Sequence, residues 1–514
     1  MKKRFNITGN CQHERHYMVD LSEKLVKIQR FIDNESYFTI NRGRQYGKTT
    51  TLAALVKFLA DAYTVVSISF ESLGSTSFEN EAVFCEKFLD RIIVATGDET
   101  WNCPEAVNFV GLSKLITKKC ANKKIVLMVD EVDKASNYHV FLGFLNMLRS
   151  KFIDRSNNVG ATFHSVILAG VYDIKNIKFK MVQDGTHRLN AEEVEQNSPW
   201  NIAEKFTVDM SFSVKEISTM LIAYEKDHQT GMNITQIATE IYAYTNGYPV
   251  LVSTICRYID EDLESDWSIS GVEESVRRIV RETDNELFKS LAQNLERNDG
   301  VRNLLYDALV LGKRRSFSTD NPNIELAFRY GYIKEVREHV KVFNRIFEMR
   351  LSNYFITKDE ERGESISHGG LINEITKNGQ FDMALCLERF ALHWQEIYNE
   401  KDAKFYERQC RMIFLTYLKP ILNGCGFYFI ESTLTDDRRM DVVVIYNQQR
   451  FILELKIWKG QLYNEKGVEQ LLGYVKKMGE DRGYLLTFDF RKNPERIKPL
   501  WRTESGAQIF EVRV

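Results

Sequence analysis

One nine-residue segment, 41–49, constrains the fold of this chain more than any other part of the sequence. It follows a short apolar run, 37–40, and precedes a segment, 50–62, whose apolar residues recur at helical spacing. The segment ends in Gly-Lys-Thr (47–49), which matches the second half of the glycine-rich loop that binds phosphate between a strand and a helix. A strand, a glycine turn and a helix in this order predict the beginning of a parallel α/β sheet.

The loop departs from the usual phosphate-binding pattern at one position, because Arg42 stands where that pattern has its first glycine and Gly43 follows it. The second glycine lets backbone N–H groups face a phosphate, and the start of the following helix adds positive potential. The lysine is predicted to reach the β- and γ-phosphates of a nucleotide, and the threonine hydroxyl to bind Mg²⁺. The predicted nucleotide-binding positions in the loop are Gly43, Arg44, Gly47, Lys48, Thr49 and Thr50.

A second motif follows the apolar run 125–129, about 80 residues after the loop. A run without polar residues predicts a strand buried on both faces, and Asp130 and Glu131 stand at its carboxyl end. Because ligands bind outside the carboxyl ends of strands in open α/β sheets, both acids are expected beside the loop. Asp130 is predicted to hold Mg²⁺ through water, and Glu131 to polarise the water that attacks the γ-phosphate.

The sequence does not assign two further features of this site, the residue that senses the γ-phosphate and the arginine finger. The runs 65–70 and 166–169 are predicted to complete the sheet. After the second run, Tyr172 and Asp173 are candidates for sensing the γ-phosphate, and an ordinary turn explains them equally well. An arginine finger is not assigned, because three arginines qualify and none stands out: Arg149, Arg155 and Arg188.

Changes of pattern along the chain divide it into five predicted parts. Strand-like runs give way to helical periodicity after about residue 206, and a helix-stop signal, Asn246-Gly-Tyr-Pro249, interrupts that periodicity. Two helical segments and the β-like runs 331–336 and 340–349 then follow in an order that resembles a winged helix. The predicted parts are an α/β core at 1–206, a helical lid at 207–300, a winged-helix-like segment at 301–356, a polar linker at 357–370 and a C-terminal α/β domain at 371–514.

The C-terminal part contains a second constellation of charged residues, in two β-rich runs, 441–446 and 451–457, around a short polar turn. Glu454 and Lys456 are two residues apart and share one face of their strand, and the leucines and isoleucine beside them take the opposite, buried face. A turn centred on Asn447-Gln448 places Asp441 opposite Glu454, and a longer turn places it opposite Lys456. Two carboxylates and a lysine on one face fit phosphodiester hydrolysis assisted by Mg²⁺ or Mn²⁺.

Five segments carry a resemblance to a known family: His16–Asp20, Asn41–Thr49, Val129–Glu131, Leu168–Gly170 and Asn246–Pro249. They resemble the AAA-ATPase-like family of bacterial proteins, which is related to archaeal-type and STAND ATPases. The resemblance implies a P-loop NTPase core of AAA/STAND-like type that takes ATP and Mg²⁺, with the helical part as a lid over the nucleotide. It also implies that Tyr17 stacks near the adenine, although an early tyrosine by itself is more often a core residue.

Members of that family often carry a C-terminal PD-(D/E)xK nuclease-like domain, and the pattern of Asp441, Glu454 and Lys456 resembles that signature. The resemblance implies that Glu407 is the acid of the family's helix and that Gln470 is the glutamine of its second helix. Asp441, Glu454 and Glu407 would then hold the metal, and Lys456 would position water or neutralise the transition state. The family's proline before the aspartate is absent here. A degenerate, inactive fold used for binding is the alternative.

Charge and cysteine usage bear on location and partners. The whole chain has a net charge of −2, whereas residues 404–514 carry 19 Lys+Arg against 14 Asp+Glu, a difference of +5. A basic C-terminal part suits a nucleic-acid partner, DNA rather than RNA, and a solvated basic face explains it comparably. Scattered cysteines, no apolar run long enough for a membrane span and no signal-peptide pattern predict a cytoplasmic protein, which the sequence leaves free to form an oligomer.

The leading functional interpretation is an ATP-binding and ATP-hydrolysing protein coupled to a Mg²⁺-dependent nuclease-like domain, in defence or mobile-element biology. The second is an ATP-dependent switch whose nuclease-like domain only binds a nucleic acid or a partner. The third is a DNA-binding regulator that uses the winged-helix-like segment.

Overall fold

The computed structural model describes residues 3–135, 139–171, 200–282, 284–309, 315–361, 375–377, 379–397, 407–422, 426–432, 440–447, 449–491 and 498–514. The chain forms two compact units, which are described separately. Unit 1 comprises Met1–Tyr242, Asn246–Tyr258 and Arg329–Gly331, and unit 2 comprises Ala243–Thr245, Ile259–Phe328 and Tyr332–Val514.

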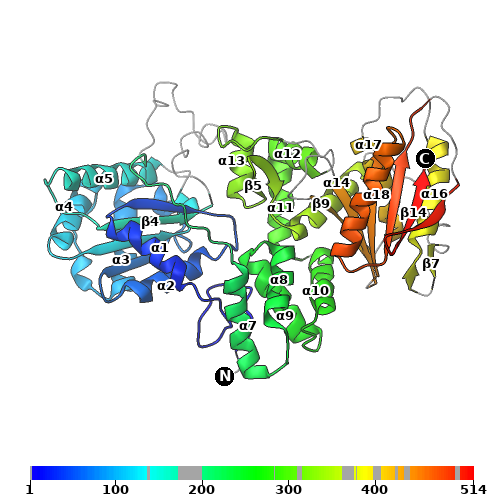
Figure 1. Ribbon diagram of the computed structural model, residues 1–514. Helices are drawn as coiled ribbons and strands as arrows, with labels where there is room; N and C mark the ends of the chain where they lie inside the picture. Colours follow the sequence, from blue (N-terminus) through cyan, green and yellow to red (C-terminus); the bar gives the residue numbers. More distant parts are fainter. Residues whose placement is uncertain are drawn as a thin grey trace. The chain divides into compact units, whose positions relative to one another are not determined.

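A four-stranded parallel sheet forms the centre of unit 1, with the strand order β1-β4-β3-β2 (Figure 1). The predicted parallel α/β core is therefore confirmed, as are its four strands. Every residue of β3 and β4 is buried, as the apolar sequence of these central strands predicts. The strands are β1 (Tyr37–Asn41), β2 (Thr64–Ser69), β3 (Ile125–Asp130) and β4 (Ser165–Gly170).

Helices cover both faces of this sheet, and alternate strand residues supply the two cores. On one face, Val126 and Met128 pack with α1 (Ser22–Asp33) and α2 (Lys48–Leu59). On the other face, Leu127 and Val129 pack with three helices and the short 3₁₀ turns between them. These elements are α3 (Glu81–Thr96), α4 (Phe109–Cys120) and α5 (His139–Ser156), with η1 (Ser75–Phe78), η2 (Glu99–Trp101) and η3 (Val132–Ala135).

Helices replace strands after the sheet, as predicted for 207–300. A complete capping box begins α7 (Val214–His228), since Ser213 and Glu216 satisfy each other's backbone N–H groups. Between α8 (Ile234–Thr245) and α9 (Pro249–Asp262), Asn246 and Gly247 have φ of 48° and 72°, so the predicted helix stop is a left-handed turn. A Cβ on Gly247 would overlap the backbone of Phe212, so this turn requires glycine.

The described residues in the first part of unit 2 form several helices and a two-stranded antiparallel sheet. The helices are α10 (Ile269–Arg281), α11 (Glu286–Arg297), α12 (Asp299–Leu309) and α13 (Pro322–Arg329), and the strands are β5 (Ile333–Val336) and β6 (His339–Val342). The predicted second strand, 340–349, is wrong beyond Val342, because α14 (Arg345–Glu361) begins there. Asn344 caps this helix by accepting from Phe347 N at 2.8 Å, a side-chain signal that apolar patterning alone does not reveal.

The C-terminal part of unit 2 is built on a six-stranded mixed sheet with the order β13-β14-β12-β11-β10-β9. β9, β10 and β11 form an antiparallel meander, whereas β11, β12 and β14 run parallel. The three strands predicted in this part, 441–446, 451–457 and 484–488, are confirmed. The strands are β9 (Gly426–Ser432), β10 (Met440–Tyr446), β11 (Gln449–Ile457), β12 (Arg482–Phe488), β13 (Leu500–Glu504) and β14 (Ala507–Arg513).

Helices cover both faces of this second sheet as well. One face packs against α16 (Met383–Ile397) and α17 (Glu407–Leu422), and the other packs against α18 (Gln461–Lys477). The face of Glu454 and Lys456 is therefore buried, in addition to the opposite face that the sequence predicts to be buried. A short pairing of β7 (Thr376–Lys377) with β8 (Gln380–Phe381) precedes α16. Residues 357–361 of the predicted linker continue α14, and 362–370 lie outside the described residues.

Candidate functional site

The phosphate-loop segment joins β1 to α2 through a turn with two left-handed residues, Gln45 at φ 57° and Gly47 at φ 77°. A Cβ on Gly43 would overlap the carbonyl oxygen of Tyr330, which lies in the same unit. Glycine is therefore required at 43 by close backbone approach, and Arg42 occupies a position where a side chain fits. This accounts for the displaced first glycine of the motif.

The ammonium group of Lys48 points back into the loop. Its Nζ donates to the carbonyl oxygens of Arg42 and Gly43, each at 3.0 Å, and the residue is 6% exposed. Burial lowers the pKa of Lys48, while the negative charges of Glu131, Asp133 and Asp130 oppose that shift. The ammonium group is thus held by two loop carbonyls and lies within the field of three acids.

Thr49 and Asp130 bring the two predicted motifs into direct contact. Thr49 Oγ1 donates to Asp130 Oδ2 at 2.6 Å, and the other carboxylate oxygen accepts from the backbone N–H of Glu131 at 2.9 Å. A hydroxyl and a carboxylate oxygen side by side suit Mg²⁺, which prefers hard oxygen ligands. Within the described ranges, no three His, Cys, Asp or Glu residues gather closely enough to hold a metal, so phosphate and water would supply the other ligands.

Glu131 follows β3 in a left-handed conformation, with φ of 54°. Burial raises the pKa of its carboxyl group, and Lys48 acts in the opposite direction. The structure thus brings Lys48, Thr49, Asp130 and Glu131 to the carboxyl edge of the sheet, where the sequence predicts them. Gly43, Arg44, Gly47 and Thr50 lie in the same loop and the first turn of α2.

One acid of this site was missed by the sequence reasoning. Asp133 lies in η3, and its Oδ2 accepts from the backbone N–H of Val171, just after β4, at 2.5 Å. Its charge also acts on both Lys48 and Glu131. The signal in the sequence was the third acid of Asp130-Glu-Val-Asp133, whose spacing indicates no role until the turn after β3 is known.

Tyr17 packs in an aromatic cluster of unit 1. It is 4% exposed, its ring contacts Phe5 and Tyr224, and its hydroxyl donates to Asp227 at 3.0 Å and lies 3.2 Å from His228 Nε2. These contacts join the N-terminal segment to α7. Stacking of Tyr17 on an adenine stays a prediction, and it requires part of this cluster to open.

The structure places the arginine-finger candidates in different surroundings. Arg155 donates to the carbonyl oxygens of Phe163, His164 and Glu35 at 2.7–2.8 Å. Those carbonyls precede β4 and β1, at the edge of the sheet opposite the phosphate loop, so Arg155 serves no finger role in this chain's own site. Arg149 lies on α5, and Arg188, Tyr172 and Asp173 lie outside the described residues.

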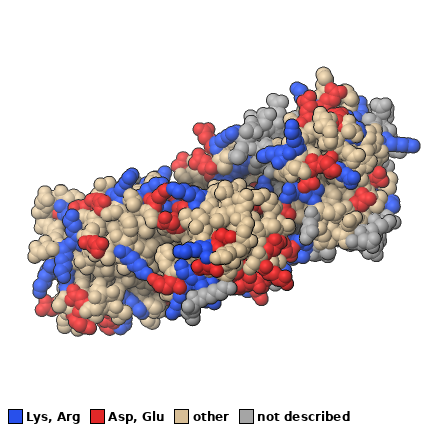
Figure 2. All heavy atoms as spheres, turned by 60° about the horizontal axis from the view of Figure 1, so that its bottom comes forward, with Lys and Arg blue, Asp and Glu red and all other residues tan. Residues whose placement is uncertain are grey.

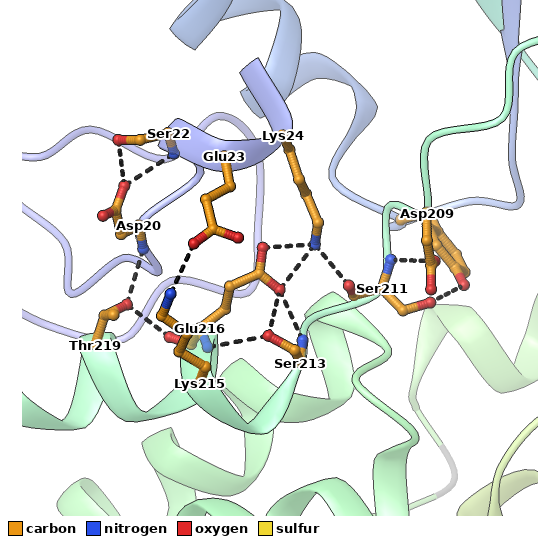
Figure 3. Close-up of polar contacts among 11 residues, drawn as sticks. Asp20, Ser22, Glu23, Lys24, Asp209, Ser211, Ser213, Lys215, Glu216 and Thr219 are labelled. Atoms are coloured by element: carbon orange, nitrogen blue, oxygen red, sulfur yellow. Dashed lines mark hydrogen bonds and ion pairs between the residues drawn. The ribbon is translucent and has the colours of Figure 1, made fainter. Parts of the chain in front are cut away.

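The helical part of unit 1 is tied to the core beside the phosphate loop (Figure 3). Lys24 of α1, 8% exposed, donates to Ser211 O at 2.6 Å and forms an ion pair with Glu216 of α7 at 2.9 Å. Ser211 Oγ lies 2.7 Å from the hydroxyl of Tyr46, a residue of the loop itself. A second loop contact comes from Tyr248, which donates to Arg44 O at 2.8 Å. Tyr46 and Tyr248 thus connect the loop to the helical part, although their partners could not be read from the motifs that contain them.

The second constellation lies in unit 2, where Glu454 and Lys456 form an ion pair on β11 and are each 1% exposed. α18 covers them, and a Cβ on Gly467 would lie 3.3 and 3.4 Å from two carbons of the Lys456 side chain. The absence of a side chain at 467 therefore makes room for the lysine. Gln470 lies on the same helix with its Oε1 buried and no hydrogen-bond partner among the residues that the structure describes.

The hairpin register agrees with the shorter of the two predicted turns. Tyr446 pairs with Gln449 and Val442 with Leu453, so one further step places Asp441 opposite Glu454. The side chains of Asp441 and Glu407 lie outside the described set, although both residues belong to described elements, β10 and α17. The described side chains therefore do not make a metal site here, because Glu454 is the single predicted ligand among them and it binds Lys456.

Charged side chains of both signs mix over the face drawn in Figure 2, and no large field of one sign stands out on its described part. Within the described chain, no helix is both long enough and apolar enough to cross a membrane.

No protein-family model and no curated protein matches this chain. Among solved structures, the Walker-type ATPase paby2304 of Pyrococcus abyssi is similar at 12% identity and a TM-score of 0.46, over 68% of this chain and 99% of that chain. The Aeropyrum pernix ORC2 protein in its ADPNP–ADP complexes gives 12% and 0.36, over 69% and 97%. A RuvB mutant of Thermotoga maritima gives 10% and 0.31, over 63% and 92%. At TM-scores below 0.5, these likenesses identify neither a family nor a function.

Proposed function

We propose that unit 1 binds ATP with Mg²⁺ and hydrolyses it. The contact between Thr49 and Asp130 supports this most strongly, because it joins the two motifs of a nucleotide site at one edge of a parallel sheet. Lys48 beside this pair supplies the positive charge for the phosphates. The core is proposed to be of the AAA/STAND-like type, as the sequence motifs suggest.

The proposed chemistry assigns a step to each residue. Lys48 leaves the carbonyls of Arg42 and Gly43 and binds the β- and γ-phosphates, while backbone N–H groups around Gly47 cradle them. Thr49 and Asp130 hold Mg²⁺, which supplies charge neutralisation at the phosphates when it is bound. Glu131 orients the attacking water. Its raised pKa reflects partial burial.

Glu131→Gln tests this assignment, because it changes the water-orienting group and keeps the side-chain shape. We expect the variant to bind a fluorescent ATP analogue as tightly as the parent and to lose hydrolysis by on the order of a hundredfold or more. Glu71→Gln is a suitable control, since Glu71 is an exposed acid near the same edge. Equal hydrolysis by the parent and the Glu131 variant would contradict the assignment.

We further propose that the C-terminal part of unit 2 is a PD-(D/E)xK-type module that acts on nucleic acid, DNA in the first instance. The buried pair of Glu454 and Lys456, on the strand that faces Asp441, favours this proposal. In the catalytic form, Glu454, Asp441 and Glu407 would hold Mg²⁺ or Mn²⁺, which would activate a water, and Lys456 would position that water or neutralise the transition state. The alternative is a non-catalytic module that binds nucleic acid or a partner and reports the nucleotide state of unit 1.

Cleavage of plasmid DNA in Mg²⁺ or Mn²⁺ separates these two alternatives. The active form predicts cleavage by the parent and none by Glu454→Ala, with ATP hydrolysis retained in both. Binding of DNA without cleavage in either protein supports the non-catalytic form. Binding lost on changes in 301–356, with the C-terminal module intact, supports a regulator that reads DNA through the winged-helix-like segment.

A further inference from the structure

The conformation of Glu131 needs a physical cause beyond its position after β3. A non-glycine residue in the left-handed region costs on the order of 1–3 kcal/mol, and such strain persists where the surroundings hold it. Glu131 has φ of 54°. The chain therefore turns sharply at this residue, and its carbonyl oxygen accepts from Lys134 N at 3.2 Å as η3 begins.

Two carboxylates hold this turn, one on each side of Glu131. Asp130 precedes it, and its oxygens bind Glu131 N and Thr49 Oγ1. Asp133 follows it, and its carboxylate reaches across to β4 and accepts from Val171 N at 2.5 Å. The turn is thus attached to the phosphate loop at one end and to the neighbouring strand at the other.

Gly170, the last residue of β4, provides the space that Asp133 occupies. A Cβ at 170 would lie 2.9 and 3.0 Å from the two carboxylate oxygens of Asp133 and 3.0 Å from Val132 Cγ2. Gly170 is not among the residues with positive φ, so its backbone conformation suits alanine. Space for the carboxylate, and not backbone freedom, is therefore what glycine provides at this position.

We propose that Asp133 is a positioning residue, seated against Gly170, that holds Glu131 in the orientation needed for ATP hydrolysis. This inference rests on the proposed ATPase function and deepens it. The contacts of Lys48 with its loop carbonyls and of Thr49 with Asp130 do not involve Asp133, so we expect ATP binding to be largely independent of the Asp133 contact. Loss of the seat lets the turn after β3 relax, and the water-orienting carboxylate moves away from its place.

Two substitutions in separate segments remove the same contact. Asp133→Ala deletes the carboxylate, and Gly170→Ala fills its seat. We expect each to lower kcat roughly tenfold to a hundredfold, because a displacement of about 1 Å at a reacting group costs that much. KM and the Kd of a fluorescent ATP analogue should stay within about threefold of the parent, since the loop contacts are retained.

Two controls separate the seating of Asp133 from the effects of an added methyl group and of lost charge. Gly160→Ala adds a methyl group where no atom lies within 4 Å, so it should leave kcat unchanged. Asp133→Asn removes the charge that acts on Lys48 and keeps an oxygen to accept from Val171 N, so its kcat should lie between that of the parent and that of Asp133→Ala. Thermal unfolding and ATP-analogue binding show that each variant is folded at the site.

The double variant Asp133→Ala/Gly170→Ala should be no slower than the slower single variant, because both changes break one contact. Additive losses would overturn the inference, as would parent-like kcat in Gly170→Ala. An Asp133→Asn variant as slow as Asp133→Ala would also overturn it, since charge and not seating would then be the cause. A parent that binds no ATP overturns the proposed function itself, whereas an active parent with unaffected variants overturns this inference alone.

Discussion

Lys48 in unit 1 and Lys456 in unit 2 are both buried lysines near carboxylates, and their surroundings differ in one respect. Lys48 stands at the first position of a helix and donates to two loop carbonyls, at 3.0 Å each. Lys456 stands inside a strand beneath a helix and binds Glu454, a neighbour on the same strand face. One lysine is held by neutral groups and the other by an opposite charge.

This difference shows which of the two clusters is prepared for an anion. A lysine that leaves neutral carbonyl partners breaks no direct ion pair, although the acids around Lys48 would repel an incoming phosphate. A lysine that leaves a buried carboxylate abandons an ion whose burial costs several kcal/mol unless a cation replaces it. The proposed nucleotide site would therefore exchange only neutral partners on binding, whereas the second cluster would need a metal and an anion together.

The largest effect on stability should come from removing only one member of the buried ion pair between Glu454 and Lys456. Lys456→Met leaves Glu454 buried without its cation, and we expect a loss of about 3–5 kcal/mol in the free energy of unfolding. Glu454→Leu/Lys456→Met should restore stability to within about 1 kcal/mol of the parent, because an apolar pair suits the space. Urea unfolding measures both, with the exposed Lys477→Met as control. A double variant as unstable as the single would contradict this account.

Removing the other lysine, Lys48, should weaken ligand binding instead of stability. Lys48→Ala loses charged hydrogen bonds to two phosphates, each worth about 1.5–3 kcal/mol, so ATP affinity should fall on the order of a hundredfold or more. Calorimetric titration measures this loss. Lys57→Ala is a matched control on α2, since that side chain is 75% exposed. Unchanged affinity in Lys48→Ala would remove the basis of the proposed nucleotide site.

Lys24 is another buried lysine, and it tests whether an ion pair between two helices stabilises unit 1. Lys24→Met leaves Glu216 without the cation that ties α1 to α7, and we expect a loss of about 2 kcal/mol in the stability of unit 1. The exposed Lys27→Met on the same helix should change stability by less than about 0.5 kcal/mol. If Lys24→Met and Lys27→Met unfold at the same urea concentration, the ion pair between Lys24 and Glu216 contributes nothing to stability.

The smallest effect concerns pH. Burial lowers the pKa of His164 below its ordinary value of 6.5, so the unfolded chain binds the proton first as pH falls. His164 therefore contributes stability that is complete above pH 6.5 and is lost as pH falls toward its lowered pKa. His164→Phe keeps a ring and should flatten the dependence of unit 1 stability on pH in that window. An unchanged slope in urea unfolding across these pH values would contradict the expectation.

Local pattern predicted most elements of both sheets, for reasons visible in particular residues. Apolar runs such as 125–129 match strands buried on both faces, and the Asn246–Pro249 signal matches a left-handed helix stop. β9, β13 and β14 were not predicted, and in Leu500–Glu504 exposed and partly buried residues mix without a clear period. The error after Val342 arose because Ile346, Phe347 and Met349 suit a buried strand as well as a buried helix face.

The sequence by itself determined the residues of the phosphate loop, the acids after β3 and the alternation that makes a parallel α/β core, because these depend on neighbours along the chain. Only the tertiary structure decided that Arg155 binds the carbonyl oxygen of Glu35 at the opposite sheet edge, that Tyr46 contacts Ser211, that Lys24 ties α1 to α7, and that Asp133 lies against Gly170. Each of these contacts joins residues that are distant in the sequence. Such contacts form only when the strands pair and the helices pack, so residue spacing along the chain does not predict them.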